Sequence, residues 1–109
     1  QQTTSYTIRD LTIDKEKFTV LRGQQPITLT PTEFNLLLVL ASAPDRVFSR
    51  MQLVDKVQGG YGFEGYERTI DTHIRNLRKK LEPDPAHPTY ILTVYGIGYK
   101  FDGGNHEES

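Results

Sequence analysis

The sequence predicts a single α+β domain, in which antiparallel strands come first, three helices follow and a β-hairpin ends the fold. Three observations predict this order. Apolar residues alternate with a period of two over residues 6–30, a helical period with two start signals occupies residues 30–82, and alternation returns over residues 90–101. A chain of 109 residues can build one hydrophobic core, and its regularly spaced apolar residues exclude a disordered segment.

The first third of the domain is predicted to form a small antiparallel sheet. Turn-forming residues at 14–17 and 22–25 separate short apolar runs. The apolar residues of these runs are Ile8, Leu11, Ile13, Phe18, Val20, Ile27 and Leu29.

Two capping boxes predict where the first two helices start. Thr30 can cap a helix that has Pro31 at its first position, and Glu33 completes the T-x-x-E pattern. Ser49 and Gln52 repeat the pattern as S-x-x-Q. The stripe predicted to be buried on the first helix is Phe34, Leu37, Leu38 and Ala41, and the second helix carries Met51, Leu53, Val54 and Val57.

Residues 67–82, ERTIDTHIRNLRKKLE, predict a third helix with two incompatible faces. Its apolar stripe is Ile70, Ile74, Leu77 and Leu81. The opposite side carries Arg68, Thr69, Thr72, Arg75, Asn76 and Lys79. Cations mixed with short hydrogen-bonding side chains suit phosphates and base edges, so this helix is predicted to lie in a DNA groove.

Charge and composition narrow the possible classes of protein. The net charge is −1, but residues 67–80 hold five Lys/Arg against two Asp/Glu, a local balance of +3. The absence of cysteine excludes disulfides and thiolate chemistry. No apolar run approaches the roughly 18 residues of a membrane span, and the polar start is not a signal peptide. We therefore expect a soluble, cytoplasmic protein with no membrane partner.

The remaining motifs do not indicate an enzyme. Residues 90–101 predict a β-hairpin, and Gly96-x-Gly98 lacks the third glycine and the following helix of a dinucleotide-binding loop. The three histidines have no metal-ligand spacing. We expect no catalytic residue, no cofactor and no metal.

Four segments together resemble one family. LTPTEFNLL (29–37), VFSRMQLV (47–54), RTIDTHIRNLRKKLE (68–82) and VYGIGYKF (94–101) are similar, in order and spacing, to the DNA-binding effector domain of OmpR/PhoB-type response regulators. The resemblance runs from about Leu11 to Phe101. It implies a winged helix-turn-helix, with residues 1–5 a linker, 6–102 the domain and 103–109 a tail. The family's receiver domain is missing, so the chain is expected to be an effector fragment.

The contacts expected with DNA follow from side-chain chemistry and from this resemblance. Asn pairs well with adenine and Arg with guanine, so the residues expected to read bases are Thr72, Arg75 and Asn76. Contacts with the DNA backbone are expected from Arg68, Thr69, His73, Arg78 and Lys79. Two alternatives stay open: Arg75 and Asn76 could be ordinary solvated residues, and His73 and Arg78 flank the apolar stripe, where either could close the edge of the core.

The resemblance also implies roles for the hairpin and for the loop before the third helix. The wing residues expected to touch the adjacent minor groove or the backbone are Thr93, Tyr95, Gly96 and Tyr99. Many family members carry Arg at the position of Tyr95, so a weaker wing contact is expected here. In the glycine-rich loop 58–66, the residues expected to contact RNA polymerase are Tyr61, Phe63 and Tyr66; the alternatives are a flexible connector or a loop folded onto the core.

The function predicted is sequence-specific binding of double-stranded DNA by a transcriptional response regulator. Helix 67–82 would lie in the major groove and hairpin 90–101 in the adjacent minor groove. The resemblance further implies control by phosphorylation, and a homodimer of the full-length protein on direct-repeat promoter sites. The alternative is a winged-helix protein–protein interaction module. The cationic helix favours DNA, whereas the net acidity and Tyr95 favour the alternative.

Overall fold

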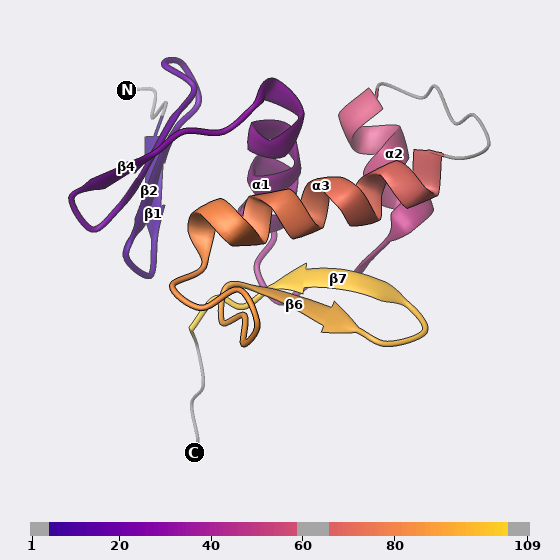
Figure 1. The fold of residues 1–109 in the computed structure, drawn as a ribbon. Coiled ribbons are helices and arrows are strands. Elements are labelled where there is room, and N and C mark those ends of the chain that lie inside the picture. Colours follow the sequence, from indigo (N-terminus) through magenta and orange to yellow (C-terminus); the bar gives the residue numbers. More distant parts are fainter. Residues whose placement is uncertain (1–4, 59–65, 105–109) are drawn as a thin grey trace.

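The computed structural model describes residues 5–58 and 66–104, and it has the order of elements that the sequence predicts. A four-stranded sheet comes first, three helices follow, and a hairpin lies beneath the third helix (Figure 1). The prediction of an α+β winged helix-turn-helix is confirmed.

The N-terminal sheet is an antiparallel meander in the order β1-β2-β3-β4. Its strands are β1 (Ser5–Ile8), β2 (Leu11–Asp14), β3 (Thr19–Arg22) and β4 (Gln25–Ile27). Leu11, Ile13 and Val20 point into the core. Phe18 was expected in a strand, but it lies in the turn before β3 with a φ of 54° and is 63% exposed. Its ring packs edge-on against Phe34, with 5.0 Å between ring centres.

The helices are α1 (Pro31–Ser42), α2 (Arg50–Gln58) and α3 (Tyr66–Leu81). Both capping boxes are confirmed. The Glu33 N–H donates to Thr30 Oγ1 at 3.2 Å, and the Thr30 N–H donates to Glu33 Oε1 at 3.0 Å. Ser49 and Gln52 exchange the same pair of bonds at 2.9 and 3.1 Å. These local bonds fix where α1 and α2 begin.

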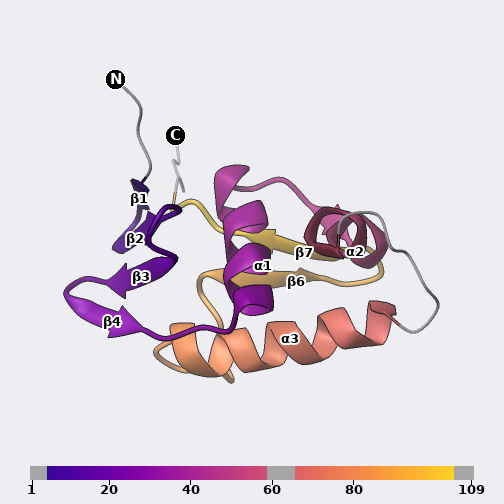
Figure 2. The same ribbon diagram turned by 90° about the horizontal axis from the view of Figure 1, so that it is seen from above.

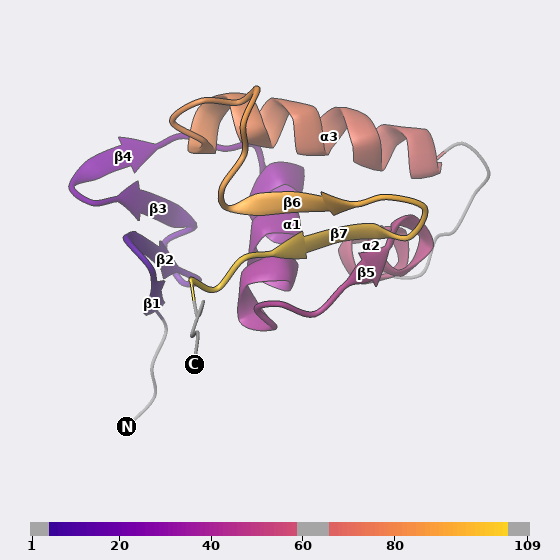
Figure 3. The ribbon, with the colours of Figure 1, turned by 90° about the horizontal axis from the view of Figure 1, so that it is seen from below.

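A second sheet carries the predicted hairpin and one strand that was not predicted. β5 (Phe48–Ser49), β6 (Ile91–Val94) and β7 (Gly98–Phe101) form the order β5-β7-β6, all antiparallel. Figure 3 shows β5 leading into α2 while the β6–β7 hairpin extends along α3. The wing is therefore joined to the chain segment that starts α2.

One core joins the three helices to both sheets. α1 lies between the N-terminal sheet and α2 (Figures 1 and 2), and its buried residues belong to one core cluster that also contains residues of both neighbours. Leu36 and Leu40 are fully buried, whereas Leu38, expected in the buried stripe, is only half-buried. The stripe on α1 is wider than one face because the helix is covered on more than one side.

Candidate nucleic-acid interface

α3 presents an apolar face to the core and a polar face to solvent, as its sequence predicts. The residues of its apolar face, each at most 1% exposed, are Ile70, Ile74, Leu77 and Leu81. Four residues at positions i, i+3, i+4 and i+7 line the other side and form what we call the reading stripe: Thr72, Arg75, Asn76 and Lys79. Asn76 is half-buried and the other three are exposed. The structure therefore gathers all three predicted base-reading residues on one accessible line.

The positive charge on this face is smaller than the sequence count suggests. Lys80 Nζ lies 2.6 Å from Glu33 Oε1, so this cation is directed back into the protein. Arg78 is likewise turned toward the wing. Among the described side chains of α3, Arg75, Lys79 and Lys80 are exposed, but Lys80 is paired with Glu33, and the side chain of Arg68 lies outside the described part. The field at this face therefore depends on a few side chains rather than on the five-to-two count.

Arg78 connects α3 to the first wing strand. Its Nε and Nη2 donate to the Ile91 carbonyl at 3.1 and 2.9 Å, and Nη2 also donates to Thr93 Oγ1 at 2.8 Å. The guanidinium carbon lies 5.6 Å from the centre of the Tyr99 ring. The sequence left two roles open for Arg78, a contact with the DNA backbone or a place at the edge of the core. The structure supports the place at the edge of the core, and a contact between Arg78 and the DNA backbone stays a prediction.

Asp71 connects α3 to two further elements. Arg50 Nη1, at the start of α2, lies 2.8 Å from Asp71 Oδ2, and the Tyr99 hydroxyl of β7 donates to Asp71 Oδ1 at 2.7 Å. Burial and then the bonded carboxylate raise the pKa of Tyr99 to about 12. The phenol therefore stays protonated at neutral pH and keeps donating to Asp71. Sequence reasoning missed Asp71, because its partners lie far away in the chain.

The wing tip is the most exposed apolar feature beside the helix. Tyr95 is 89% exposed and Ile97 is 60% exposed. The Ile97 N–H donates to the Val94 carbonyl at 2.9 Å, closing a turn in which Gly96 has a φ of 81°. At Gly98 the chain passes so close to β5 that a Cβ would overlap the Phe48 carbonyl oxygen. Gly96 thus shapes the tip, and Gly98 permits the β5–β7 pairing.

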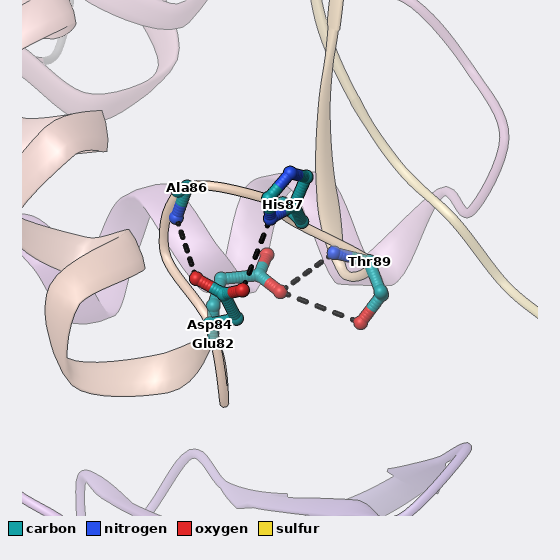
Figure 4. Close-up of polar contacts among 5 residues, drawn as sticks. All are labelled: Glu82, Asp84, Ala86, His87 and Thr89. Carbon is teal, nitrogen blue, oxygen red and sulfur yellow. Dashed lines mark hydrogen bonds and ion pairs between the residues drawn. The ribbon is translucent and has the colours of Figure 1, made fainter.

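A buried carboxylate holds the base of the wing. Glu82 follows α3 and is 4% exposed, yet its oxygens accept backbone N–H bonds from Thr89, Tyr90 and Ile91 at 2.7–3.1 Å. Figure 4 shows Glu82 reaching Thr89, with the exposed Asp84–His87 pair in the connecting turn. The helix dipole disfavours an acid at a helix C-terminus. The position of Glu82 in the sequence was therefore a signal that its carboxylate has another role.

The N-terminal sheet is tied to the same end of α3. Arg22 donates to the Leu81 carbonyl, and Arg9 donates to the Thr89 carbonyl at 2.6 Å. The Tyr90 hydroxyl donates to Asp10, and burial followed by this carboxylate raises the pKa of Tyr90 to about 12. The C-terminal end of the helix and the base of the wing therefore form one rigid junction with the sheet.

Two grooves flank the contact between α3 and the wing. The first lies beside the wing tip and is lined by Arg50, Asp71, Thr93, Val94, Tyr95, Gly96, Ile97, Gly98 and Tyr99. The second lies along the helix and is lined by Asp71, Arg75, Arg78, Lys79, Pro85, Ala86 and Tyr99. Asp71 and Tyr99 line both, so the two grooves meet at this hydrogen-bonded pair.

The remaining predicted residues are only partly placed. Thr69 and His73 are half-buried on α3. Tyr61 and Phe63 lie outside the described residues, and Tyr66, expected in the loop, is instead the first residue of α3. Within residues 5–58 and 66–104, no group of three potential metal ligands occurs, and no helix is long and apolar enough to cross a membrane.

A polar helix face beside an exposed β-hairpin, both carried on a three-helix core, defines a winged helix-turn-helix domain of the kind found in DNA-binding regulators. The chain matches over residues 23–101 the family described as "Transcriptional regulatory protein, C terminal", and it belongs to this family. The predicted resemblance to the DNA-binding effector domain of OmpR/PhoB-type response regulators is confirmed.

Individual relatives agree with this assignment. The chain is 49% identical over 92 residues to the transcriptional regulatory protein YclJ of Bacillus subtilis, covering 84% of this chain and 39% of YclJ. It is 44% identical over 93 residues to the DNA-binding response regulator MtrA of Mycobacterium tuberculosis, covering 85% and 40%. The crystal structure of the Klebsiella pneumoniae RstA DNA-binding domain in complex with the RstA box superposes with a TM-score of 0.82, at 30% identity, covering 91% and 97%. The chain thus spans about two fifths of the length of the curated relatives.

Proposed function

We propose that this domain binds double-stranded DNA sequence-specifically, with α3 in the major groove and the β6–β7 hairpin at the adjacent minor groove. The observation that carries the proposal is the reading stripe, a line of hydrogen-bonding and cationic side chains opposite a fully buried face. An α-helix fits the major groove, where such side chains can reach base edges. The RstA domain, which was crystallised with its DNA box, supports this placement by its fold.

Each part of the surface has a separate task in this proposal. Thr72, Arg75 and Asn76 read bases, because their side chains offer a methyl group, paired donors and an amide along one line. The residues that contact phosphates are Arg68, Thr69, His73 and Lys79. Arg78 contributes mainly by holding the wing, since its guanidinium already bonds Ile91 and Thr93.

The wing contributes an apolar contact rather than a charged one. Tyr95 and Ile97 project from its tip, and Gly96 lets the backbone turn sharply between them. Thr93 and Tyr99 are bonded to α3 through Arg78 and Asp71, so their contacts with DNA are made from fixed positions. Without an Arg at the tip, the minor-groove contact depends on packing and on a hydroxyl group.

Regulation and partners follow the family and belong to the whole protein. We place it in the bacterial cytoplasm with the DNA, as a response regulator whose full-length form binds direct repeats as a homodimer and contacts RNA polymerase. Residues 1–5, of which Ser5 already lies in β1, would join this domain to a receiver domain, with residues 103–109 a tail. A direct repeat would supply affinity that one domain lacks, because the second binding event becomes effectively intramolecular.

Binding-site selection from a random duplex pool, washed at low and at moderate salt, tests the proposal. A short enriched motif, repeated at about one helical turn, is the expected result. Retention at low salt without any motif would contradict specific recognition and leave phosphate binding alone. The exposed Tyr95 and Ile97 would then favour a protein–protein interaction module, because exposed apolar groups are common at such surfaces.

A further inference from the structure

α3 holds both strands of the wing at a single rung of the hairpin. Thr93 of β6 and Tyr99 of β7 are cross-strand partners. Thr93 accepts a hydrogen bond from Arg78 at 2.8 Å, and Tyr99 donates one to Asp71 at 2.7 Å. We call these four residues, Asp71, Arg78, Thr93 and Tyr99, the helix–wing clamp.

The spacing of the clamp residues along α3 makes it rigid. Asp71 and Arg78 stand at i and i+7, on the same face and about 10 Å apart along the helix axis. Two attachment points at that separation restrict sliding of the wing along α3 and also its rotation. The Arg78 guanidinium also lies over the Tyr99 ring, 5.6 Å from its centre, so the residue that bonds β6 contacts β7 as well. Arg50 holds the other Asp71 oxygen at 2.8 Å, which fixes the carboxylate itself.

We propose that the helix–wing clamp determines DNA specificity indirectly, by setting the distance between the bases read by α3 and the position reached by the wing tip. This inference rests on the proposed function. The residues of the helix–wing clamp are positioning residues, because Asp71 and Tyr99 act through the placement of Tyr95 and Ile97. A wing held at one distance can match only one separation of major-groove and minor-groove contacts.

Tyr99→Phe tests the clamp with the smallest change, because it removes only the hydroxyl that bonds Asp71. Tyr90→Phe is the matched control: this tyrosine also donates its hydroxyl to an aspartate, Asp10, and its pKa is also raised to about 12. Its bond, however, ties the wing base to the N-terminal sheet rather than to α3. A general loss of stability would affect both variants alike.

The first measurement needs no DNA. The chain has no cysteine, so spin labels can be placed on Ile97→Cys at the wing tip and Lys79→Cys on α3 without further changes. We expect Tyr99→Phe to broaden the distribution of distances between the two labels and Tyr90→Phe to leave it unchanged. Identical distributions in Tyr99→Phe and wild type would overturn the clamp.

The second measurement compares two duplexes: the selected site, and the same site with the wing-proximal base pairs randomised. Tyr99→Phe should bind the selected site about three- to tenfold more weakly and bind the randomised duplex as wild type does. An equal fall on both duplexes, or the same pattern in Tyr90→Phe, would overturn the role in specificity. If wild type enriched no motif, the proposed function would fail instead, and the label distances would still decide the clamp.

Discussion

Lys80, in the last turn of α3, forms an ion pair with Glu33, the buried acid of the capping box of α1, with 2.6 Å between Nζ and Oε1. The same Glu33 oxygen accepts the Thr30 N–H at 3.0 Å. One carboxylate therefore starts α1 and also attaches the C-terminal end of the helix proposed to read DNA. A cation that the sequence counts toward DNA binding instead fixes how two helices meet.

This pair predicts a pH-dependent contribution to stability. Burial alone would raise the pKa of Glu33, but the bonds from Lys80 and Thr30 and the charge of Lys80 lower it below 4.5. Because the pKa of Glu33 is lower in the folded protein than in the unfolded chain, its ionised carboxylate stabilises the fold. This contribution is complete above the ordinary pKa of 4.5 and is lost as the pH falls through the lowered pKa. We expect Lys80→Ala to reduce the free energy of unfolding by about 1.5–3 kcal/mol at neutral pH.

Urea unfolding of wild type and Lys80→Ala, repeated between about pH 7 and pH 3, measures the effect. The difference between the two proteins should shrink as the pH falls, because Glu33 becomes neutral in both. Lys79→Ala is the matched control, since Lys79 is exposed and should change stability by less than about 0.5 kcal/mol. A difference that stays constant over the whole range would show that Lys80 acts by packing alone.

Gly98 predicts a steric requirement in the wing. A Cβ at this position would overlap the Phe48 carbonyl oxygen and lie 2.9 Å from Ser49 Cα, both of which are backbone atoms that cannot move independently of β5. We expect Gly98→Ala to cost more than about 2 kcal/mol in thermal or urea unfolding, because the β5–β7 pairing must open.

Gly96→Ala separates this steric effect from a conformational one. Gly96 has open space around it but a φ of 81°, so alanine there meets strain without a clash. Its expected cost is about 1 kcal/mol. An equal loss of unfolding free energy in Gly98→Ala and Gly96→Ala would mean that β5 can move away from β7 to make room for the added Cβ, and would contradict the proposed steric requirement at Gly98.

Glu82 predicts that the wing loosens when its anchoring charge is removed. Glutamine has one acceptor oxygen and an NH₂ group that would face the N–H groups of Thr89, Tyr90 and Ile91. Glu82→Gln should therefore lower the free energy of unfolding by about 2–3 kcal/mol and speed hydrogen exchange at these amides. Asp84→Asn, in the exposed turn of Figure 4, should change stability by less than about 0.5 kcal/mol. Unchanged exchange at the three amides in Glu82→Gln would show that the backbone bonds are dispensable.

Features set by neighbouring residues could be predicted from the sequence. The two capping boxes and the apolar face of α3 need partners only three or four residues away, and all are present in the structure. β5 was not predicted, because a two-residue strand exists only through its pairing with β7 about fifty residues later. Phe18 was placed wrongly since alternation alone cannot show where a strand gives way to a turn.

The candidate site follows the same division. The reading stripe was predicted because helical periodicity alone puts its members on one line. Asp71, Arg78 and Glu82 acquired their structural roles from partners on α2 and the wing. An acid at a helix C-terminus marks Glu82 as unusual, but a single sequence does not show which residues these three side chains pair with. The same distance explains why the charge of α3 was overestimated: Lys80 and Arg78 find their partners 47 and 15 residues away.

Within the reading stripe, Asn76 and Lys79 should have different effects on binding. An amide paired with adenine discriminates among bases, whereas an exposed ammonium attracts every phosphate alike. On the selected site, Asn76→Ala should cost about 1–3 kcal/mol of binding free energy and relax the base preference at one position. Lys79→Ala should weaken binding to all duplexes equally and reduce the slope of log K against log salt by about one. Titrations of matched and single-mismatch duplexes at several salt concentrations measure both effects. If Asn76→Ala lowered the affinity for every duplex by the same factor, Asn76 would contact the backbone, and the register proposed for α3 in the groove would have to be rotated.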